Sequence, residues 1–256
     1  MNFDALDAKM RGFEESQDRC VPPEVYMVAR LDGRGFTGLT KDRHAFQAPF
    51  DEKFRDMMTT TAAHVMVCGV RAIFGFTQSD EISVLLHRDC SAFSRKLRKL
   101  NSVLAGEASA RFSLLLGDVG VFDCRICELP NSQTVVDYFR WRQEDAARNA
   151  LNAHCYWKLR SEGLVVDQAT QSIAGLSTSE KNELLFQRGV NFNDLPLWQK
   201  RGVGLSWEEY DKEGANPKTG EKTLAKRRRI AMMTELPRGE EYSEKLRQIV
   251  NDASRA

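Results

Sequence analysis

The first 131 residues of the chain alternate between helical and strand patterns of apolar positions. Apolar runs bounded by turn residues predict strands at 25–32, 71–77, 82–87 and 121–129. Apolar positions three and four residues apart predict helices at 2–16, 50–68 and 94–116. After the first helix the order is β-α-β-β-α-β, which is typical of a ferredoxin-like α+β fold.

This order of elements predicts which sequence segments meet. Right-handed crossovers place the third strand between the first and the second, antiparallel to both. The end of the first strand then lies at the same sheet edge as the turn between strands two and three. Asp32 ends the first strand, and Asp80 and Glu81 form that turn. The sequence therefore predicts that these three carboxylates converge.

The second half of the chain has a mostly helical pattern. Helical spacing covers 135–161, 167–174 and 178–187, and an extended segment follows at 198–210. Residues 212–221 are rich in Gly, Lys and Pro and predict a flexible basic loop, and a last helix is expected near the C-terminus. We expect a catalytic domain at 1–131 and, packed on it, a mostly helical extension at 132–256.

Composition indicates the cellular compartment of the protein more clearly than its function. The chain has 256 residues, of which 42% are hydrophobic, and its net charge is +1, which neither requires nor excludes nucleic acid. Cys124 and Cys127 form a CxxC inside a predicted strand, where a period of two sends them to opposite faces, so buried thiols are expected. Because neither a signal peptide nor a run of ~20 apolar residues is found, we expect a cytoplasmic chain without a membrane partner.

The carboxylates carry the strongest chemical signal. Asp32 with Gly33 could be an ordinary turn, and Asp80 with Glu81 could be a plain hairpin tip. Converging carboxylates, however, repel each other unless a cation neutralises them. Mg²⁺ prefers one or two carboxylates together with phosphate oxygens. We therefore predict a divalent-metal site over a nucleoside triphosphate, with backbone N–H groups of residues 33–36 facing the phosphates.

Each of two basic clusters could either bind a ligand or simply be solvated. Residues 95–99 (RKLRK) begin a predicted helix, where Arg95 and Lys99 would share a face that either binds phosphate or is solvated. Residues 226–229 (KRRR) are similar to a nucleic-acid patch, although no aromatic residue lies beside them in the sequence. Neither cluster decides the function alone.

Several motifs together resemble one known family. They are RLDGRGF at 30–36, QSDE at 78–81, the basic start of a helix at 93–99, FDCR at 122–125, DYFRWRQ at 137–143 and KNELLF at 181–186. Over residues 3–210 the chain resembles the tRNA-histidine guanylyltransferase family of 3′–5′ nucleotide-adding polymerases. The resemblance implies a polymerase-palm fold for the βαββαβ unit.

The resemblance also implies roles by position. Asp32, Asp80 and the Gly33 carbonyl would bind two Mg²⁺ ions, and Glu81 would be the adjacent essential acid. Nucleotide-binding positions would be Asp32, Gly33, Arg34, Gly35, Phe36, Thr37, Ser79, Asp80, Lys96 and Lys99. RNA would contact Lys181 and Asn182, and the basic run adds Arg227, Arg228 and Arg229. ATP or GTP would activate the 5′ end of a tRNA, and the assembly would be a homotetramer.

One departure from the family pattern bears on the substrate. The family histidine that is tied to recognising the histidine anticodon is replaced by Ala147. The sequence therefore favours templated repair of 5′-truncated tRNA over addition of one guanylate to histidine tRNA. A nucleotidyl cyclase and a non-catalytic RNA-binding protein are the alternatives from other classes.

Overall fold

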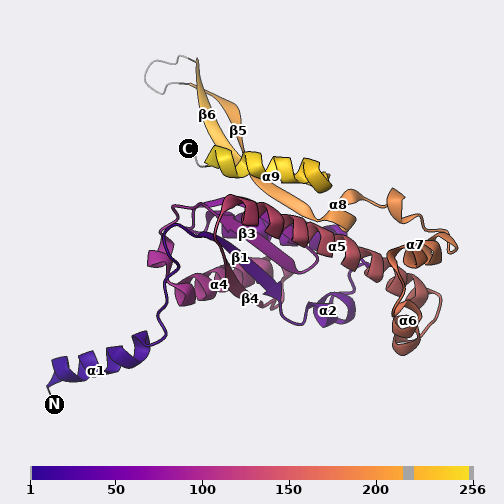
Figure 1. Ribbon diagram of the computed structural model, residues 1–256, viewed down its shortest axis with the longest axis horizontal. Helices are drawn as coiled ribbons and strands as arrows, with labels where there is room; N and C mark the ends of the chain where they lie inside the picture. Colours follow the sequence, from indigo (N-terminus) through magenta and orange to yellow (C-terminus); the bar gives the residue numbers. More distant parts are fainter. Residues whose placement is uncertain (1, 216–221, 254–256) are drawn as a thin grey trace.

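The structure, a computed structural model, describes residues 2–215 and 222–253, which form a six-stranded sheet flanked by helices (Figure 1). Every pair of neighbouring strands in the order β4-β1-β3-β2-β5-β6 is antiparallel. The strands are β1 (Tyr26–Gly33), β2 (Ala72–Gln78), β3 (Glu81–Leu86), β4 (Phe122–Leu129), β5 (Val203–Ala215) and β6 (Lys222–Met233). The α+β fold class is thus confirmed.

The predicted topology of the first four strands is also confirmed. Strand β3 lies between β1 and β2, and β4 pairs with the other side of β1. The register places Asp32 directly opposite Glu81, so the end of β1 meets the β2–β3 turn. This edge is where the chemistry is expected.

Helices cover both faces of the sheet. Helices α3 (Glu52–Val67) and α4 (Leu97–Leu116) lie on one face, and α5 (Ser132–Ser161) and α9 (Gly239–Ala253) lie on the other (Figure 1). Side chains of β1 alternate between the two cores. Met27, Ala29 and Leu31 pack toward α3 and α4, whereas Tyr26 and Val28 pack toward α5 and α9.

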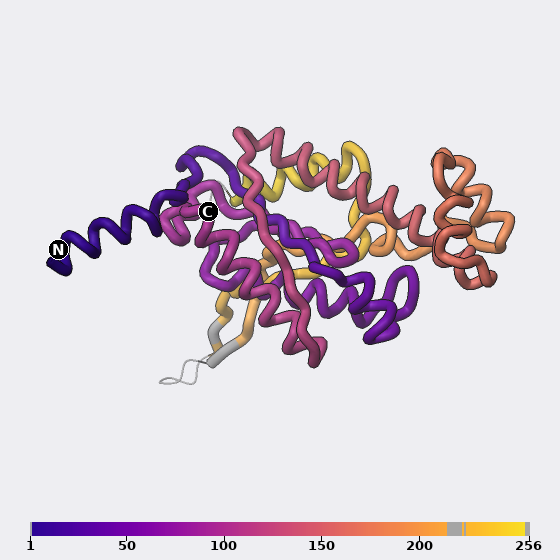
Figure 2. Tube along the Cα trace, turned by 90° about the horizontal axis from the view of Figure 1, so that it is seen from below, coloured from indigo at the N-terminus to yellow at the C-terminus, as the bar shows by residue number. Residues whose placement is uncertain are grey.

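The remaining helices extend from this body. Helices α6 (Val166–Ile173) and α7 (Thr178–Phe186) lie at the C-terminal end of α5, and α8 (Leu197–Arg201) leads into β5. At the opposite end of the molecule, α1 (Phe3–Glu15) projects from the body (Figure 2). The side chain of Asn2 caps α1 by accepting a hydrogen bond from Ala5 N at 3.0 Å.

The CxxC cysteines are separated by the sheet. Cys124 packs against the core under α3 and α4, and Cys127 packs against the core under α5 and α9. Burial raises the pKa of Cys124 to about 12 and also raises the pKa of Cys127. The sheet thus separates the two thiols as expected, but both are half-buried rather than fully buried.

The predicted helix at 94–116 is wrong at its start. Phe93, Ser94 and Arg95 have left-handed φ angles of 53°, 53° and 58°, and α4 begins only at Leu97. The buried Arg95 guanidinium requires this turn, because it donates hydrogen bonds to the carbonyls of Val21, Pro22, Val25, Arg88 and Cys90. Arg95 and Lys99 therefore do not share a helix face.

The second half of the chain is less helical than its pattern suggests. Residues 212–215 of the predicted flexible loop belong to β5, and the basic run is part of β6. Residues 216–221 of that loop lie outside the described residues. Strand β5 pairs with β2, so residues beyond 131 extend the sheet. The division into two domains after residue 131 stays a prediction.

Candidate functional site

The β1 end and the β2–β3 turn hold Asp32 and Asp80 side by side. Gly33 N donates to Asp80 O at 3.1 Å. Ser79, the residue before Asp80, adopts a left-handed φ of 52°. Burial raises the pKa of Asp80, and the nearby Asp32 carboxylate raises it further. Two carboxylates that disfavour each other's charge are a natural place for a cation.

Neither of these two carboxylates forms a salt bridge among the described residues. No Lys, Arg or His nitrogen of that part of the chain lies within 4 Å of Asp32 or Asp80, although the Arg142 guanidinium attracts Asp32 from farther away. Hard oxygen donors that form no direct ion pair fit Mg²⁺. Gly33 sits tightly beside them, because a Cβ there would lie 2.6 Å from the Phe36 ring.

Glu81 differs from the other two acids. Its Oε1 accepts a hydrogen bond from Arg30 Nη2 at 2.5 Å, and its Oε2 accepts one from Arg142 Nη2. Arg142 lies on α5 and its side chain is buried. Arg142 was absent from the candidates because nothing in the sequence links position 142 to position 81.

The loop after β1 has fewer free backbone N–H groups for binding phosphate than expected. The N–H groups of Gly33 and Arg34 already donate to Asp80 O and Val121 O. Those of Gly35, Phe36 and Thr37 open a helical turn and have no backbone acceptor among residues 2–215 and 222–253. The buried Phe36 ring, 4.9 Å from the Phe122 ring, fixes this turn.

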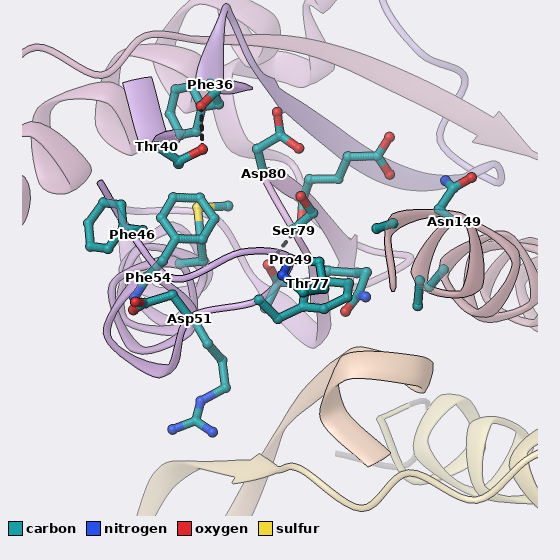
Figure 3. Close-up of a pocket in the computed structure, with 18 of the residues that line it drawn as sticks. Phe36, Thr40, Phe46, Pro49, Asp51, Phe54, Thr77, Ser79, Asp80 and Asn149 are labelled. Atoms are coloured by element: carbon teal, nitrogen blue, oxygen red, sulfur yellow. Dashed lines mark hydrogen bonds between the residues drawn. The ribbon is translucent and has the colours of Figure 1, made fainter. Parts of the chain in front are cut away.

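A cavity of about 280 Å³ opens beside the carboxylates. Asp80 lies between Phe46, Phe54 and Asp51 on one side and Asn149 of α5 on the other (Figure 3). The lining mixes apolar side chains with charged ones, which include Lys41, Arg55, Glu81 and Arg142, and pockets with convergent polar groups are usual for small-ligand sites. Its lining includes Phe36, Thr37, Phe46, Pro49, Phe50, Asp51, Phe54, Ser79, Asp80, Ala146, Asn149, Ala150 and Trp157.

The loop before α3 is fixed by its own charged residues. Asp51 accepts hydrogen bonds from Phe54 N at 3.0 Å and Gln47 N at 2.9 Å. Although burial alone would raise it, these bonds hold the pKa of Asp51 below its ordinary value. Lys41 donates to Gln47 O at 3.0 Å. Asp51 is not among the residues that the sequence singles out, although its place at the start of a predicted helix is typical of an N-cap.

Lys96 and Lys99 lie far from this cavity. Lys96 precedes α4 and pairs with Asp18 at 2.7 Å, and Lys99 is exposed one turn later. Leu97 N donates to Arg19 O, which places this helix start near the beginning of β1. Asp32 is near the other end of that eight-residue strand, about 20 Å away at 3.3 Å per residue. The structure does not bring these lysines to the carboxylates.

The other predicted RNA contacts are on the extension. Lys181 and Asn182 lie half-buried on α7, where Lys181 O accepts from Cys155 Sγ at 3.5 Å. Arg228 and Arg229 lie on β6, with their guanidinium carbons 5.4 Å from the Trp207 ring and 5.2 Å from the Tyr210 ring. Strand pairing thus supplies aromatic neighbours that the local sequence lacks.

The basic run also faces acidic residues on β5. Arg228 is opposite Glu209, and Arg229 is opposite Glu208 and forms a salt bridge with it. If the run binds RNA, replacing Arg227, Arg228 and Arg229 with alanine should reduce the slope of log Kd against log salt by about 2 to 3 units. Filter binding of tRNA over a salt series measures this slope. Arg247→Ala, which removes an arginine paired within α9, is the control, and an unchanged slope in the triple variant would assign the run to solvent.

An antiparallel sheet with two unpaired carboxylates at its edge, beside a nucleotide-sized cavity, defines a palm-like polymerase arrangement. In the described ranges, no helix is both long enough and apolar enough to span a membrane. Comparisons with known proteins specify the class further.

A family model described as tRNAHis guanylyltransferase matches residues 7–130, and one described as the Thg1 C-terminal domain matches residues 133–245. The probable tRNA(His) guanylyltransferase of Drosophila melanogaster is 34% identical over 206 residues, covering 77% of this chain and 71% of that protein. The tRNA(His) guanylyltransferase of Debaryomyces hansenii is 31% identical, covering 83% and 86%. The chain belongs to the tRNAHis guanylyltransferase family and is a nucleotidyltransferase.

Solved structures agree with this membership. A bacterial tRNA(His) guanylyltransferase (Thg1)-like protein in complex with GTP superposes with a TM-score of 0.75 and 28% identity, covering 96% of this chain and 99% of that one. A complex of such a bacterial protein with ATP gives a TM-score of 0.75 and 27% identity, covering 95% and 98%. The palm-like fold inferred from the sequence is therefore confirmed.

Proposed function

We propose that this chain adds nucleotides to the 5′ end of tRNA in the 3′–5′ direction, using Mg²⁺ and nucleoside triphosphates. The observation that carries the proposal is the pair of neighbouring carboxylates, Asp32 and Asp80, which form no salt bridge among the described residues, and of which Asp80 lines the cavity. The relatives named as tRNA(His) guanylyltransferases and the bacterial complexes with GTP and ATP support this choice of substrates.

The carboxylates of Asp32 and Asp80 and the carbonyl of Gly33 would hold two Mg²⁺ ions. Metal bound there would stabilise the negative charge that develops on phosphate oxygens during transfer. The free N–H groups of Gly35 and Phe36 would orient the triphosphate of a nucleotide at the same edge.

The reaction has two balanced steps in this proposal. The 5′-phosphate of the RNA first attacks the α-phosphate of ATP or GTP and releases pyrophosphate. The 3′-hydroxyl of the incoming nucleotide then attacks the activated 5′-phosphate and releases the nucleoside monophosphate. Both steps are in-line displacements at phosphorus, for which positioning and electrostatics supply most of the catalysis. The apolar walls formed by Phe46 and Ala150 would hold a base beside the carboxylates.

The family resemblance also suggests a domain division, RNA contacts and an assembly. We propose that residues 1–131 form the catalytic domain and 132–256 the extension, in line with family models that meet between residues 130 and 133. Lys181 and Asn182 would contact RNA. Any phosphate that Lys96 and Lys99 bind would not be the one held at Asp32 of the same chain. A cytoplasmic homotetramer is proposed, which sedimentation equilibrium of the purified chain would test.

The finer substrate choice rests on Ala147. This half-buried residue of α5 carries only a methyl group, which cannot hydrogen-bond a base edge or stack on it. Selection of one anticodon at this position is therefore weak, and we propose that pairing of the incoming nucleotide with the opposite acceptor strand selects the product. The function is then repair of 5′-truncated tRNA.

Substrate competition tests the repair proposal. We expect kcat/KM on a tRNA that lacks its first 5′ nucleotide to exceed that on full-length histidine tRNA by at least about tenfold, which is about 1.4 kcal/mol of transition-state binding. Changing the base opposite the missing nucleotide should change the base that is added, and changing the anticodon should have no effect. A preference for full-length histidine tRNA that disappears with its anticodon would contradict repair.

A further inference from the structure

Of the three acids at the sheet edge, only Glu81 forms salt bridges among the described residues, whereas Asp32 and Asp80 form none. Asp32 and Glu81 are cross-strand neighbours, so their side chains leave the sheet on the same face. Both oxygens of Glu81 are nevertheless occupied, one by Arg30 and one by Arg142. In the portion of the chain that is described, no three His, Cys, Asp or Glu side chains come together to hold a metal ion. Glu81 therefore does not complete a three-carboxylate site with Asp32 and Asp80.

Arg142 is held from two sides. Its Nη2 donates to Glu81, its Nη1 donates to Asp145 Oδ2 at 3.1 Å, and its guanidinium carbon lies 4.8 Å from the Trp141 ring. Only 4% of its side chain is exposed, compared with 25% for Glu81. Because Arg142 belongs to α5 and Glu81 to β3, this ion pair joins the helix to the edge of the sheet.

Anchoring Glu81 also anchors the turn before it. Glu81 O accepts a hydrogen bond from Thr77 Oγ1 at 2.8 Å, and Asp80 O accepts one from Gly33 N at 3.1 Å. With its side chain fixed by Arg142 and its carbonyl fixed by Thr77, Glu81 can rotate little. Asp80 is the next residue in the chain, so its carboxylate is aimed by the same contacts.

We propose that Arg142 is a positioning residue: by clamping Glu81 it keeps that acid out of the metal pair and sets the orientation of the Asp80 carboxylate, on which the rate of transfer depends more than the affinity for metal does. The inference rests on the proposed function, because it assigns Asp32 and Asp80 to the metal. Charge repulsion gives a reason for the clamp. Asp32 and Asp80 already disfavour each other's charge, and an unpaired Glu81 opposite Asp32 would add a third negative charge and more repulsion.

A double-mutant cycle tests the clamp. The variants are Glu81→Gln, Arg142→Gln and the double variant. Asp80→Asn is the reference for a lost metal ligand, and Arg140→Gln is a matched control, since Arg140 also lies on α5 and pairs with a glutamate, Glu144, at 3.8 Å. The readouts are the single-turnover rate of nucleotide addition and, separately, Mn²⁺ affinity measured by electron paramagnetic resonance with a non-hydrolysable ATP analogue.

We expect Glu81→Gln and Arg142→Gln each to slow addition by about 30-fold, and the double variant to be no slower than the slower single variant. Mn²⁺ affinity should change by less than about threefold in these variants but fall by more than about tenfold in Asp80→Asn. Arg142→Lys, which keeps the charge but not the two-pronged geometry, should have an intermediate rate.

Two results would overturn the clamp. A loss of Mn²⁺ affinity in Glu81→Gln as large as that in Asp80→Asn would make Glu81 a metal ligand. Rate effects that multiply in the double variant would show that Glu81 and Arg142 act independently. If no RNA accepts nucleotides, the proposed function fails, but the clamp can still be tested. The melting temperatures of the unaltered chain, Glu81→Gln, Arg142→Gln and the double variant then form the cycle. Additive shifts in melting temperature would contradict the clamp.

Discussion

Asp80→Asn is expected to lower the rate of nucleotide addition by at least about 10³-fold, which corresponds to about 4 kcal/mol of transition-state stabilisation. The amide keeps the shape of the side chain but cannot neutralise a cation. Folding should be unaffected, because burial and Asp32 raise the pKa of Asp80. A carboxyl group with a raised pKa destabilises the folded state above that pKa, and asparagine cannot ionise. The melting temperature at neutral pH should therefore stay the same or rise.

Single-turnover assays at saturating Mg²⁺ measure this effect. Asp89→Asn is the control, since Asp89 follows β3 at the far end of the strand and its side chain is 77% exposed. Its activity should equal that of the unaltered chain. A near-normal rate of nucleotide addition by Asp80→Asn would show that Asp80 is not a metal ligand.

The second large effect is on stability. Arg95→Ala should lower the free energy of unfolding by about 4 kcal/mol, because it removes the donors to five backbone carbonyls at a buried site. Three consecutive left-handed residues, Phe93 to Arg95, are each unfavourable by about 1–2 kcal/mol, and these hydrogen bonds hold them in place. For a chain of this size the melting temperature should fall by about 10 °C.

Thermal unfolding followed by circular dichroism measures the loss. Arg98→Ala is the matched control, because Arg98 is exposed and its partner Asp18 keeps a second salt bridge with Lys96. Surface pairs are worth about 1 kcal/mol or less, so this variant should melt within a few degrees of the unaltered chain. Equal melting temperatures for the two variants would show that Arg95 does not hold the turn.

The sequence predicted the site edge because local rules determine it. Period-two patterns locate the four strands, and the handedness of the crossovers brings Asp32 to the β2–β3 turn, as the Asp32–Glu81 register confirms. No long-range information was required. The metal and nucleotide roles of these residues, however, remain predictions.

The features that the sequence did not predict depend on distant partners. The left-handed turn at Arg95 forms because carbonyls at 21–25 accept its hydrogen bonds, which helical periodicity cannot indicate. The sequence of β6 alone indicates a basic segment without regular structure. Pairing with β5 places Glu208 and Trp207 next to its arginines. Arg142 lies in the DYFRWRQ motif of the family resemblance, but only the fold shows that it contacts Glu81.

The proposed function requires that nucleotides are added at the 5′ end of an RNA. Incubation with α-labelled nucleoside triphosphate and Mg²⁺, with and without a tRNA that lacks its first 5′ nucleotide, shows whether this happens when the labelled products are mapped by end-specific digestion. We expect label at the 5′ end of the RNA, in the presence of RNA only. A cyclic nucleotide formed from the triphosphate alone, or tRNA that is bound but unlabelled, would contradict the proposed function.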